Sequence, residues 1–301
     1  MSSNDAQLNW TDDQWARINR AVAETARKAR VASGFLPLVG PLPSSQVTVP
    51  AQAMSNARVP ERLRGEADER LVVVEHDTLW LATLSAEVYL KNSEVADPEL
   101  ASATAMFCRA ADVIARLEDA IIFNGQPDSG EAPQIDGRPA VVPPIYTVHG
   151  GTPGGGLLGT PLQAVVPAGG EAGDGIVRAV VDAIQQLEAQ GHYGPFACVL
   201  GNKLFLDANT PSKGSMVLPS DRITPFLNGP LLRSSTVDAG TGVVVALAGD
   251  PVDLVVATDI TVKYLQLTLE PRYVFRVYER MALRIKQPGA VCRLLAPAKK
   301  G

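Results

Sequence analysis

Residues that commonly carry chemistry are scarce in this sequence, which has three cysteines and three histidines in 301 residues. The cysteines are odd in number and far apart, which argues against a disulfide framework and favours buried thiols in a reducing compartment. The histidines lack the short spacing of a metal site, so we predict isolated structural or surface residues and no metal. These six residues are Cys108, Cys198, Cys292, His76, His149 and His192.

Positive charge and long apolar runs are also scarce. The net charge is −5, which gives no support for nucleic acid or an anionic membrane as a partner, because both bind clustered Lys and Arg. The apolar stretches fall far short of the ~20 residues that cross a bilayer. Residues 1–9 are polar, unlike a secretory signal. We therefore expect a cytoplasmic protein.

Sequence motifs of catalysis are missing as well. The run Gly150–Gly159 (GGTPGGGLLG) superficially resembles a phosphate-binding loop but lacks its Gly-Lys-Ser/Thr ending, so we interpret it as a flexible loop. The sequence has no Gly-x-Ser-x-Gly nucleophile elbow. Glu118 and Asp119 are adjacent and would point in different directions on a helix, so a salt bridge or a solvated face is a better interpretation than an acid/base pair. We predict neither enzymatic activity nor a cofactor.

The N-terminal region contains a well-signalled amphipathic helix. Thr11 and Gln14 have the spacing of a capping box. Trp15, Ile18 and Val22 follow at helical spacing and lie on one face. The apolar face is narrow and the other faces are polar, so we expect this helix to dock against its own chain or a partner.

The segment from Phe35 to Arg70 has no helical period and contains five prolines. Gln46–Val49 is its one short β-like piece, and strand-like residues resume at Leu71–Val74 and Leu79–Leu84. A stretch this long with little regular structure is unusual inside a compact domain and is usually functional or disordered. A third possibility is an extended arm that pairs with a neighbouring subunit.

The strongest helix signal runs from Pro98 to Asn124. Asp97 is a favourable N-cap, Pro98 suits the first helical position, and Gly125 ends the helix. Apolar residues between them repeat every three or four positions. At ~1.5 Å per residue this helix would be about 40 Å long, so we expect it to be a spine for other elements.

The remaining sequence alternates between helix and strand patterns. Residues 126–175 are rich in Gly and Pro, a third helix is predicted from Asp174 to Gln190, and a buried strand follows at Phe196–Leu200. The C-terminal third is β-rich, with one slip in its period-two alternation near Leu265. A long helix combined with β-strands predicts an α+β fold.

Several blocks of the sequence resemble the encapsulin shell proteins (family 1-like, linocin or bacteriocin type). Residues 115–125 (ARLEDAIIFNG) resemble the end of the family's spine helix, with an acidic pair, apolar residues, Phe and Gly. The other blocks resemble the A-domain helix, the Gly-Pro-aromatic strand entry and the closing strands; they are residues 175–184, 191–196, 249–260, 270–277 and 288–295. The blocks occur in the family's order between about residues 71 and 295.

The resemblance implies the Hong Kong 97 phage capsid fold, which has a P-domain built on the spine helix, an extended E-loop and an A-domain. By position, the E-loop explains the proline-rich arm, which would pair with a neighbouring subunit. The implied division is an N-terminal helix and arm at 1–43, the E-loop at 44–73, the P-domain with the spine helix at 74–133, the A-domain at 134–249 and the P-domain C-terminal strands at 250–301.

The same resemblance implies a cargo-binding groove. In encapsulins an N-terminal helix lies on the lumenal side and helps to form an apolar groove for the C-terminal targeting peptide of a cargo enzyme. Trp15, Ile18 and Val22 are the candidates for this groove, with Phe275 as a possible wall. The alternative is that these side chains only dock the helix onto its own P-domain.

Family position also implies a loop near the five-fold pore. The pore-loop candidates are Pro211, Ser212, Lys213, Gly214, Ser215 and Met216.

Three segments depart from the family. The arm region and residues 84–95 match it poorly. Some relatives bind flavin through an aromatic residue near residues 84–95, but neither Trp80 nor Tyr89 can be placed in that motif, so flavin binding is not predicted. The Gly-rich segment 148–173 looks longer than usual, which leaves the pore and outer surface undetermined.

Three functions compete at this point. The first is a self-assembling icosahedral shell, with the smallest form (T=1) as the default, that encloses a cargo such as a peroxidase or a ferritin-like protein. The second is the major capsid protein of a tailed phage or prophage, which packages DNA. The third is a soluble hydrolase, which the missing catalytic constellation disfavours. The N-terminal helix favours the cage over the phage capsid.

Overall fold

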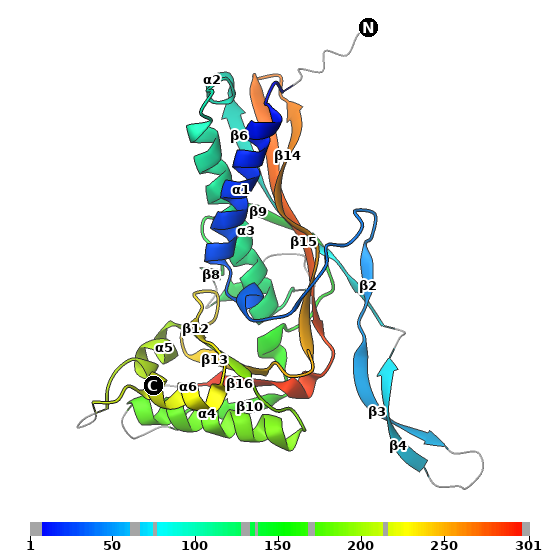
Figure 1. Ribbon diagram of the computed structural model, residues 1–301, viewed down its shortest axis with the longest axis vertical. Coiled ribbons are helices and arrows are strands. Elements are labelled where there is room, and N and C mark those ends of the chain that lie inside the picture. The colour runs from blue at the N-terminus through cyan, green and yellow to red at the C-terminus, as the bar shows by residue number, and fades with distance from the viewer. Residues whose placement is uncertain are drawn as a thin grey trace.

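The computed structural model describes residues 8–60, 67–74, 77–127, 133–135, 138–167, 172–212 and 216–296. Two five-stranded sheets, each packed with helices, form the two main parts of the molecule, and a two-stranded hairpin projects from one of them (Figure 1). This mixture of helices and sheets agrees with the predicted α+β class.

The first sheet contains the longest strands and has the order β1-β14-β15-β6-β9. β14 and β15 pair antiparallel along most of their length, with register shifts near residues 256–261 and between Tyr264 and Gln266. The second irregularity confirms the slip predicted near Leu265. The strands are β1 (Leu38–Val39), β6 (Ala82–Lys91), β9 (Tyr146–Gly150), β14 (Val252–Leu267) and β15 (Arg272–Ile285).

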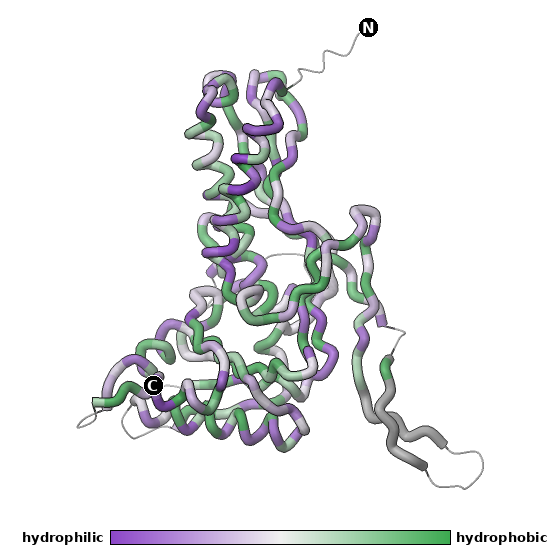
Figure 2. The backbone as a smooth tube through the Cα atoms, in the orientation of Figure 1, coloured by the Kyte–Doolittle hydropathy of each residue, from purple (hydrophilic) through white to green (hydrophobic). Residues whose placement is uncertain are grey.

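Helices α1 (Asp12–Ala29) and α3 (Ala101–Asn124) lie side by side along this sheet (Figure 1). Apolar side chains from both helices and from the sheet form one continuous core, to which α3 contributes more hydrophobic positions than α1 (Figure 2). The one-turn helix α2 (Asn92–Val95) precedes α3.

The spine helix starts three residues later than predicted, at Ala101 instead of Pro98. Leu100 has a left-handed backbone with φ of 51° and a fully buried side chain, so the chain reorients there in order to place Leu100 in the core. Asp97 still caps the turn, because its carboxylate accepts from the backbone N–H groups of Glu99 and Ala101 at 3.0 and 3.1 Å.

The second part has its own sheet and its own core. The sheet order is β10-β16-β13-β11-β12, and α4 (Ala172–Ala189), α5 (Asn202–Ala208) and α6 (Pro219–Leu227) pack with it. The predicted helix 174–190 and strand 196–200 are both present, the strand with unchanged bounds. The strands are β10 (Leu162–Val165), β11 (Phe196–Leu200), β12 (Leu231–Arg233), β13 (Thr241–Ala246) and β16 (Val291–Leu295).

Strand pairing does not follow the division predicted at residues 134 and 250. β9 falls within the range expected for the A-domain but pairs with β6 in the first sheet. β16 falls within the range expected for the P-domain but lies between β10 and β13 in the second sheet. The sheet to which a strand belongs is therefore set by its hydrogen-bonding partners and not by its position along the chain. The chain passes between the two parts more than once.

Three small strand pairs complete the described structure. β2 (Thr48–Pro50) pairs with β5 (Thr78–Trp80), and β7 (Gln134–Ile135) pairs with β8 (Arg138–Pro139). β3 (Ala53–Pro60) pairs with β4 (Ala67–Val74) to form the projecting hairpin. Part of the charged run expected to be irregular, residues 67–70, thus belongs to a strand, whereas residues 61–66 lie outside the described residues. The short 3-10 helices are η1 (Ala32–Gly34), η2 (Leu157–Gly159) and η3 (Pro288–Ala290).

Candidate functional site

The start of α1 has the local geometry that its sequence predicts. The backbone N–H of Gln14 donates to Thr11 Oγ1 at 3.3 Å, and the backbone N–H of Thr11 donates to Gln14 Oε1 at 2.9 Å. This reciprocal pair is the predicted capping box, and it satisfies two of the backbone donors that a helix start leaves free. The helix then buries a stripe made by Ile18, Val22 and Ala26.

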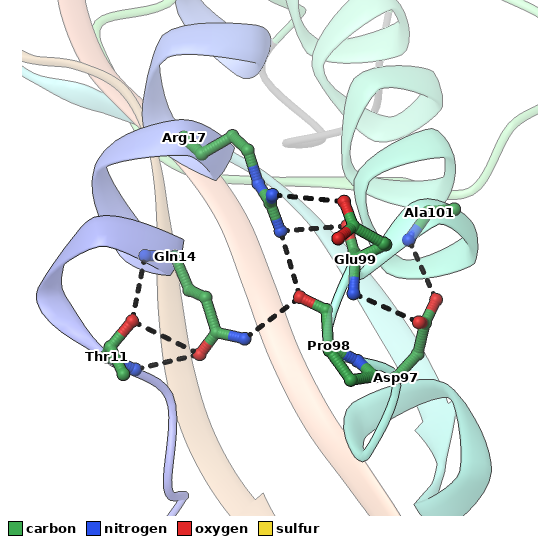
Figure 3. A network of polar contacts seen from close by, with 7 residues as sticks. All are labelled: Thr11, Gln14, Arg17, Asp97, Pro98, Glu99 and Ala101. Atoms are coloured by element: carbon green, nitrogen blue, oxygen red, sulfur yellow. Dashed lines mark hydrogen bonds and ion pairs between the residues drawn. The ribbon is translucent and has the colours of Figure 1, made fainter.

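A polar network ties this start to the turn that precedes α3 (Figure 3). Arg17 Nη2 donates to the carbonyl oxygens of Glu99 and Pro98 at 2.9 and 3.2 Å. Gln14 Nε2 donates to the Pro98 carbonyl at 3.3 Å. Arg17 Nη1 also lies 3.5 Å from Glu99 Oε2. These contacts are exposed, so each stabilises the docked helix only modestly, but together they hold the start of α1 against the turn before α3.

A group of aromatic rings in mutual contact lies between the starts of α1 and α3 and the strands β14 and β15. We call it the aromatic cluster. Phe275 is at its centre, with ring centroids 5.0 Å from Trp10, 5.1 Å from Phe107 and 5.4 Å from Tyr264. Trp10 is stacked on Phe275 with an interplanar angle of 13°. Its members are Trp10, Trp15, Phe107, Tyr264 and Phe275.

The other end of α1 is held by a buried charge cluster, which we call the Arg30 cluster: Arg30, Glu118, Asp119, Asp259 and Glu279. Arg30 Nε lies 2.5 Å from Glu118 Oε2, and Arg30 Nη2 lies 2.6 Å from Glu279 Oε1 and 2.8 Å from Asp259 Oδ1. Both glutamates are fully buried. Arg30 therefore compensates two carboxylates that no water reaches, and it links α1 to α3, β14 and β15.

Burial and crowding shift the titration of this cluster. Burial raises the pKa of Glu118, and the nearby Glu279 carboxylate raises it further. Burial also raises the pKa of Glu279, and it raises the pKa of Asp119 to about 7. Burial alone would lower the pKa of Arg30, but the carboxylates of Glu279, Glu118 and Asp259 raise it above its ordinary value. The arginine stays charged, and the carboxyl groups retain protons more readily than exposed ones.

Asp119 fixes the chain just after α1. Its carboxylate accepts from the backbone N–H of Val31 at 2.9 Å and from that of Ala32 at 2.8 Å. Of the two interpretations offered for the pair Glu118 and Asp119, the salt bridge is confirmed for Glu118. The solvated face is wrong for both residues, because the end of α3 lies in the core.

The four predicted groove residues do lie together, but three of them have no free surface. Ile18, Val22 and Phe275 are each 0% exposed, because they pack against the chain's own helices and sheet. Trp15 is partly buried at the edge. This packing is what the docking alternative describes, whereas binding of a cargo peptide here stays a prediction.

Trp10 is the member of this region that the sequence reasoning missed. It occupies the position before the N-cap Thr11, and Trp15 occupies the fourth helical position. A hydrophobic pair at these two positions is a recognised helix-start pattern, and the two rings are 5.1 Å apart. That spacing was the signal that could have identified Trp10.

The pore-loop candidates fall in the connection between α5 and α6. Lys213, Gly214 and Ser215 lie outside the described residues. Pro211 is exposed, Ser212 is half-buried, and Met216 is fully exposed. A place beside a pore remains a prediction for this loop.

The Gly-rich run 150–159 packs against the C-terminal end of α3. A side chain at Gly156 would overlap the backbone of Gly125 and Phe123, and one at Gly125 would overlap Gly154. Close backbone contact thus accounts for Gly125 and Gly156. The run also lines a cavity of about 330 Å³ together with residues of β5, α3 and β15.

Among the described residues, no three or more His, Cys, Asp and Glu side chains gather in a way that could hold a metal ion. Within the same ranges no helix is long and apolar enough to span a membrane. His149 and His192 lie far apart in the chain, and His76 falls outside the described residues.

Comparison with known proteins identifies the family. A family model described as "Encapsulating protein for peroxidase" (Linocin_M18) matches residues 3–132 and 145–282. The type 1 encapsulin shell protein EncA of Myxococcus xanthus is 27% identical over 94% of this chain and 92% of its own length. A diheme-cytochrome-encapsulin shell fusion protein of Kuenenia stuttgartiensis is 26% identical over 96% of this chain and 74% of its own.

Solved structures agree on the fold. The virus-like particle from Pyrococcus furiosus matches with a TM-score of 0.66 and 14% identity over 93% of this chain and 98% of that chain. The predicted Hong Kong 97-type architecture is therefore confirmed. This chain belongs to the encapsulin family, and it is a shell-forming subunit.

Proposed function

We propose that copies of this chain close into an icosahedral shell of the smallest type (T=1), which encloses a cargo enzyme in the cytoplasm. The shell supplies confinement and pores, and the cargo supplies the chemistry. A peroxidase or a ferritin-like protein is the cargo class we favour, and the family description, which names a peroxidase, supports the first. The cargo would carry a C-terminal targeting peptide that binds on the lumenal side, next to α1.

The observation that carries the proposal is the β3–β4 hairpin. Among the described strands, β3 and β4 pair only with each other, and the hairpin extends away from both sheets (Figure 1). An isolated two-stranded hairpin is marginally stable in water, and its open edges invite pairing with another chain. We infer that this hairpin is the E-loop and that neighbouring subunits cover it.

The second part also presents apolar side chains that assembly would cover. Tyr193, Leu206 and Phe226 are 63%, 66% and 54% exposed. Leu206 and Phe226 lie on α5 and α6, which flank the loop proposed for the five-fold pore. Large exposed apolar groups gathered on one part of a protein are typical of interaction surfaces. We infer that this part contacts its copies around the five-fold axis.

The cargo peptide would bind at the aromatic cluster. Trp10, Trp15 and Tyr264 are half-buried there, so their outer faces are accessible, while Phe275 and the apolar stripe of α1 lie beneath them. Half-buried aromatic rings offer large contact area at low conformational cost. In this arrangement Ile18, Val22 and Phe275 support the site and need not contact the peptide.

The assembly proposal is tested on the full-length protein at micromolar concentration. Size-exclusion chromatography and negative-stain microscopy should show closed particles of uniform diameter. A chain that stays monomeric or dimeric in physiological buffer would contradict the proposal. Nuclease treatment and the 260/280 nm absorbance ratio then separate a protein-filled cage from a phage-like capsid that holds DNA.

The cargo proposal is tested on particles purified from the native host. Mass spectrometry should find one enzyme in stoichiometric excess over background, and removal of its C-terminal residues should abolish its co-purification. Particles that contain no such protein would contradict the cargo proposal and leave the assembly result untouched.

A further inference from the structure

The β3–β4 hairpin is joined to the first sheet by residues 44–54, which we call the hairpin root. Two arginines of β15, Arg280 and Arg284, point toward this root. Successive side chains of a strand point to opposite faces, so both arginines lie on one face of β15, while Glu279 points to the other and pairs with Arg30. The root and the helices α1 and α3 therefore lie on opposite faces of the first sheet (Figure 1).

Arg280 holds the beginning of the root by two backbone carbonyl groups. Its Nη1 donates to the Ser44 carbonyl at 2.7 Å, and its Nη2 donates to the Gln46 carbonyl at 2.5 Å. Among the described residues no carboxylate forms an ion pair with Arg280, so its guanidinium group is engaged by the backbone of the root. A rigid planar group bonded to two carbonyls restrains their direction, whereas a single hydrogen bond allows rotation.

Arg284 holds the root further along β15. Its Nε and Nη2 donate to the two carboxylate oxygens of Asp253 at 2.8 and 2.7 Å, and only 8% and 3% of the two side chains are exposed. This buried, two-pronged pair fixes the guanidinium group, whose remaining Nη1 donates to the Pro50 carbonyl at 3.4 Å. The Met54 backbone N–H donates to the Lys286 carbonyl at 2.8 Å. The root is thus bound at successive points along β15.

Beyond the root, the hairpin has no comparable support from the first sheet. β3 and β4 pair only with each other among the described strands. The eight residues of β3 span about 25 Å, so a rotation of about 10° at the root moves the far end by about 4 Å. Small changes at the root therefore have large effects where the hairpin would meet another subunit.

We propose that Arg280 and Arg284 are positioning residues for shell assembly, which fix the direction of the hairpin and thereby the angle between neighbouring subunits. The inference rests on the proposed function, in which neighbours cover the hairpin. A ring or shell closes only if each copy repeats the same rotation, and a rotation that does not close gives open assemblies. Particles of one diameter therefore require a hairpin root of one geometry. If the two arginines only stabilise the fold, their loss leaves the particle diameter unchanged.

The test compares full-length Arg280→Ala with the wild type by negative-stain microscopy and mass photometry. The share of closed particles with the wild-type diameter should fall about fivefold, in favour of mixed diameters and open assemblies. Arg280→Lys keeps the charge but donates from a single nitrogen, so it should broaden the diameters to a smaller extent. Arg284→Lys should have a smaller effect still, because its bond to Pro50 is long; no broadening at all would exclude Arg284.

Two controls separate positioning from general stability. Arg276→Ala removes an arginine from the same face of β15, one that pairs with Glu87 of β6 and not with the root, and it should leave the diameter unchanged. Thr11→Ala weakens the start of α1, far from the hairpin, and should also give particles of the wild-type diameter. Denaturation midpoints of all variants show how much stability each one loses. Uniform particles of wild-type diameter from Arg280→Ala would overturn the inference, and so would an equal spread of diameters from Thr11→Ala.

Two further outcomes keep the test decisive. If circular dichroism shows that Arg280→Ala does not fold, Arg280→Lys takes its place, and shells of wild-type diameter from that variant overturn the inference. Wild-type protein that forms no closed particles would instead contradict the proposed assembly itself, so the two failures are distinguishable.

Discussion

The N-terminal helix and the β3–β4 hairpin are both appendages to the sheets, but they find their contacts in different places. α1 buries its apolar stripe in its own chain, Arg17 donates to the Glu99 carbonyl just before α3, and Arg30 pairs with three carboxylates. The hairpin has a strand partner only within itself among the described residues. The comparison teaches that one appendage contributes to the stability of the subunit, whereas the other has open strand edges that we propose neighbouring subunits cover.

Removal of the hairpin should have the largest effect and should leave the subunit folded. Replacement of residues 53–74 by a short Gly-Ser linker is expected to abolish closed particles, because it deletes the edge that neighbours would cover. Circular dichroism and chromatography should show a folded monomer. The control Leu269→Ser, at a fully exposed position in the β14–β15 connection, should assemble normally. If the chain that lacks the hairpin still forms closed particles, the hairpin is not needed for assembly, and the proposed difference between the two appendages is wrong.

Loss of Arg30 should destabilise the subunit itself. Arg30→Met leaves Glu118 and Glu279 buried without a counter-charge, and breaking a buried ion pair in this way typically costs about 3–5 kcal/mol. Chemical denaturation of the hairpin-deleted monomer measures this effect free of assembly. The matched control is Arg17→Met, whose ion pair with Glu99 is solvent-exposed and should contribute under about 1 kcal/mol. Equal effects of the two substitutions would show that burial of the Arg30 cluster is not what holds α1.

Stability of the monomer should fall as the pH rises between about 4 and 7. The pKa of Asp119 in the folded chain is raised to about 7, so the folded state binds its proton more tightly than the unfolded state. Its stabilising contribution is complete below the ordinary carboxyl pKa and is lost as pH rises through about 7, with a slope of at most about 1.4 kcal/mol per pH unit. Glu118 and Glu279 shift in the same direction.

Denaturation midpoints at several pH values measure this slope. Asp119→Asn should flatten it, because the amide cannot titrate but its oxygen can still accept from Val31 and Ala32. An unchanged slope would assign the pH dependence to other groups. The hairpin contributes nothing to this measurement, since it is absent from the monomer used.

The smallest effect is expected at the start of α1. Thr11→Ala removes the acceptor for the Gln14 backbone N–H and should destabilise the monomer by about 1 kcal/mol. Ser at the same position keeps a hydroxyl and should restore most of the loss. A denaturation midpoint that does not change would show that the polar contacts of Arg17 and Gln14 with α3 determine the helix start without the cap.

Elements governed by local chemistry were predictable from the sequence. The capping box of α1, the strand at 196–200 and the irregularity near Leu265 all appear where neighbouring residues alone place them. The start of α3 was mispredicted because the buried side chain of Leu100 outweighs the favourable cap and proline that precede it. The sequence also did not predict that β9 belongs to the first sheet and β16 to the second. Strand partners that are far apart in the chain leave no local signal.

At the candidate site, the sequence identified most of the residues but not how deeply their side chains are buried. Helical spacing brought Trp15, Ile18 and Val22 onto one face, yet spacing could not reveal that the face is closed by the chain's own core. Trp10 was missed although its spacing to Trp15 is a known pattern. The Arg30 cluster was beyond prediction, because its five members come from four separate places in the chain: the end of α1, α3, β14 and β15.

The sequence by itself determined the α+β class, the amphipathic helix, the spine and the resemblance to a shell protein, because periodicity, capping and block order are properties of neighbouring residues. Only the tertiary structure decided which apolar faces are covered and which remain open. Coverage depends on contacts between segments that are distant along the chain, and these contacts bury the apolar stripe of α1 while β3 and β4 pair only with each other among the described strands.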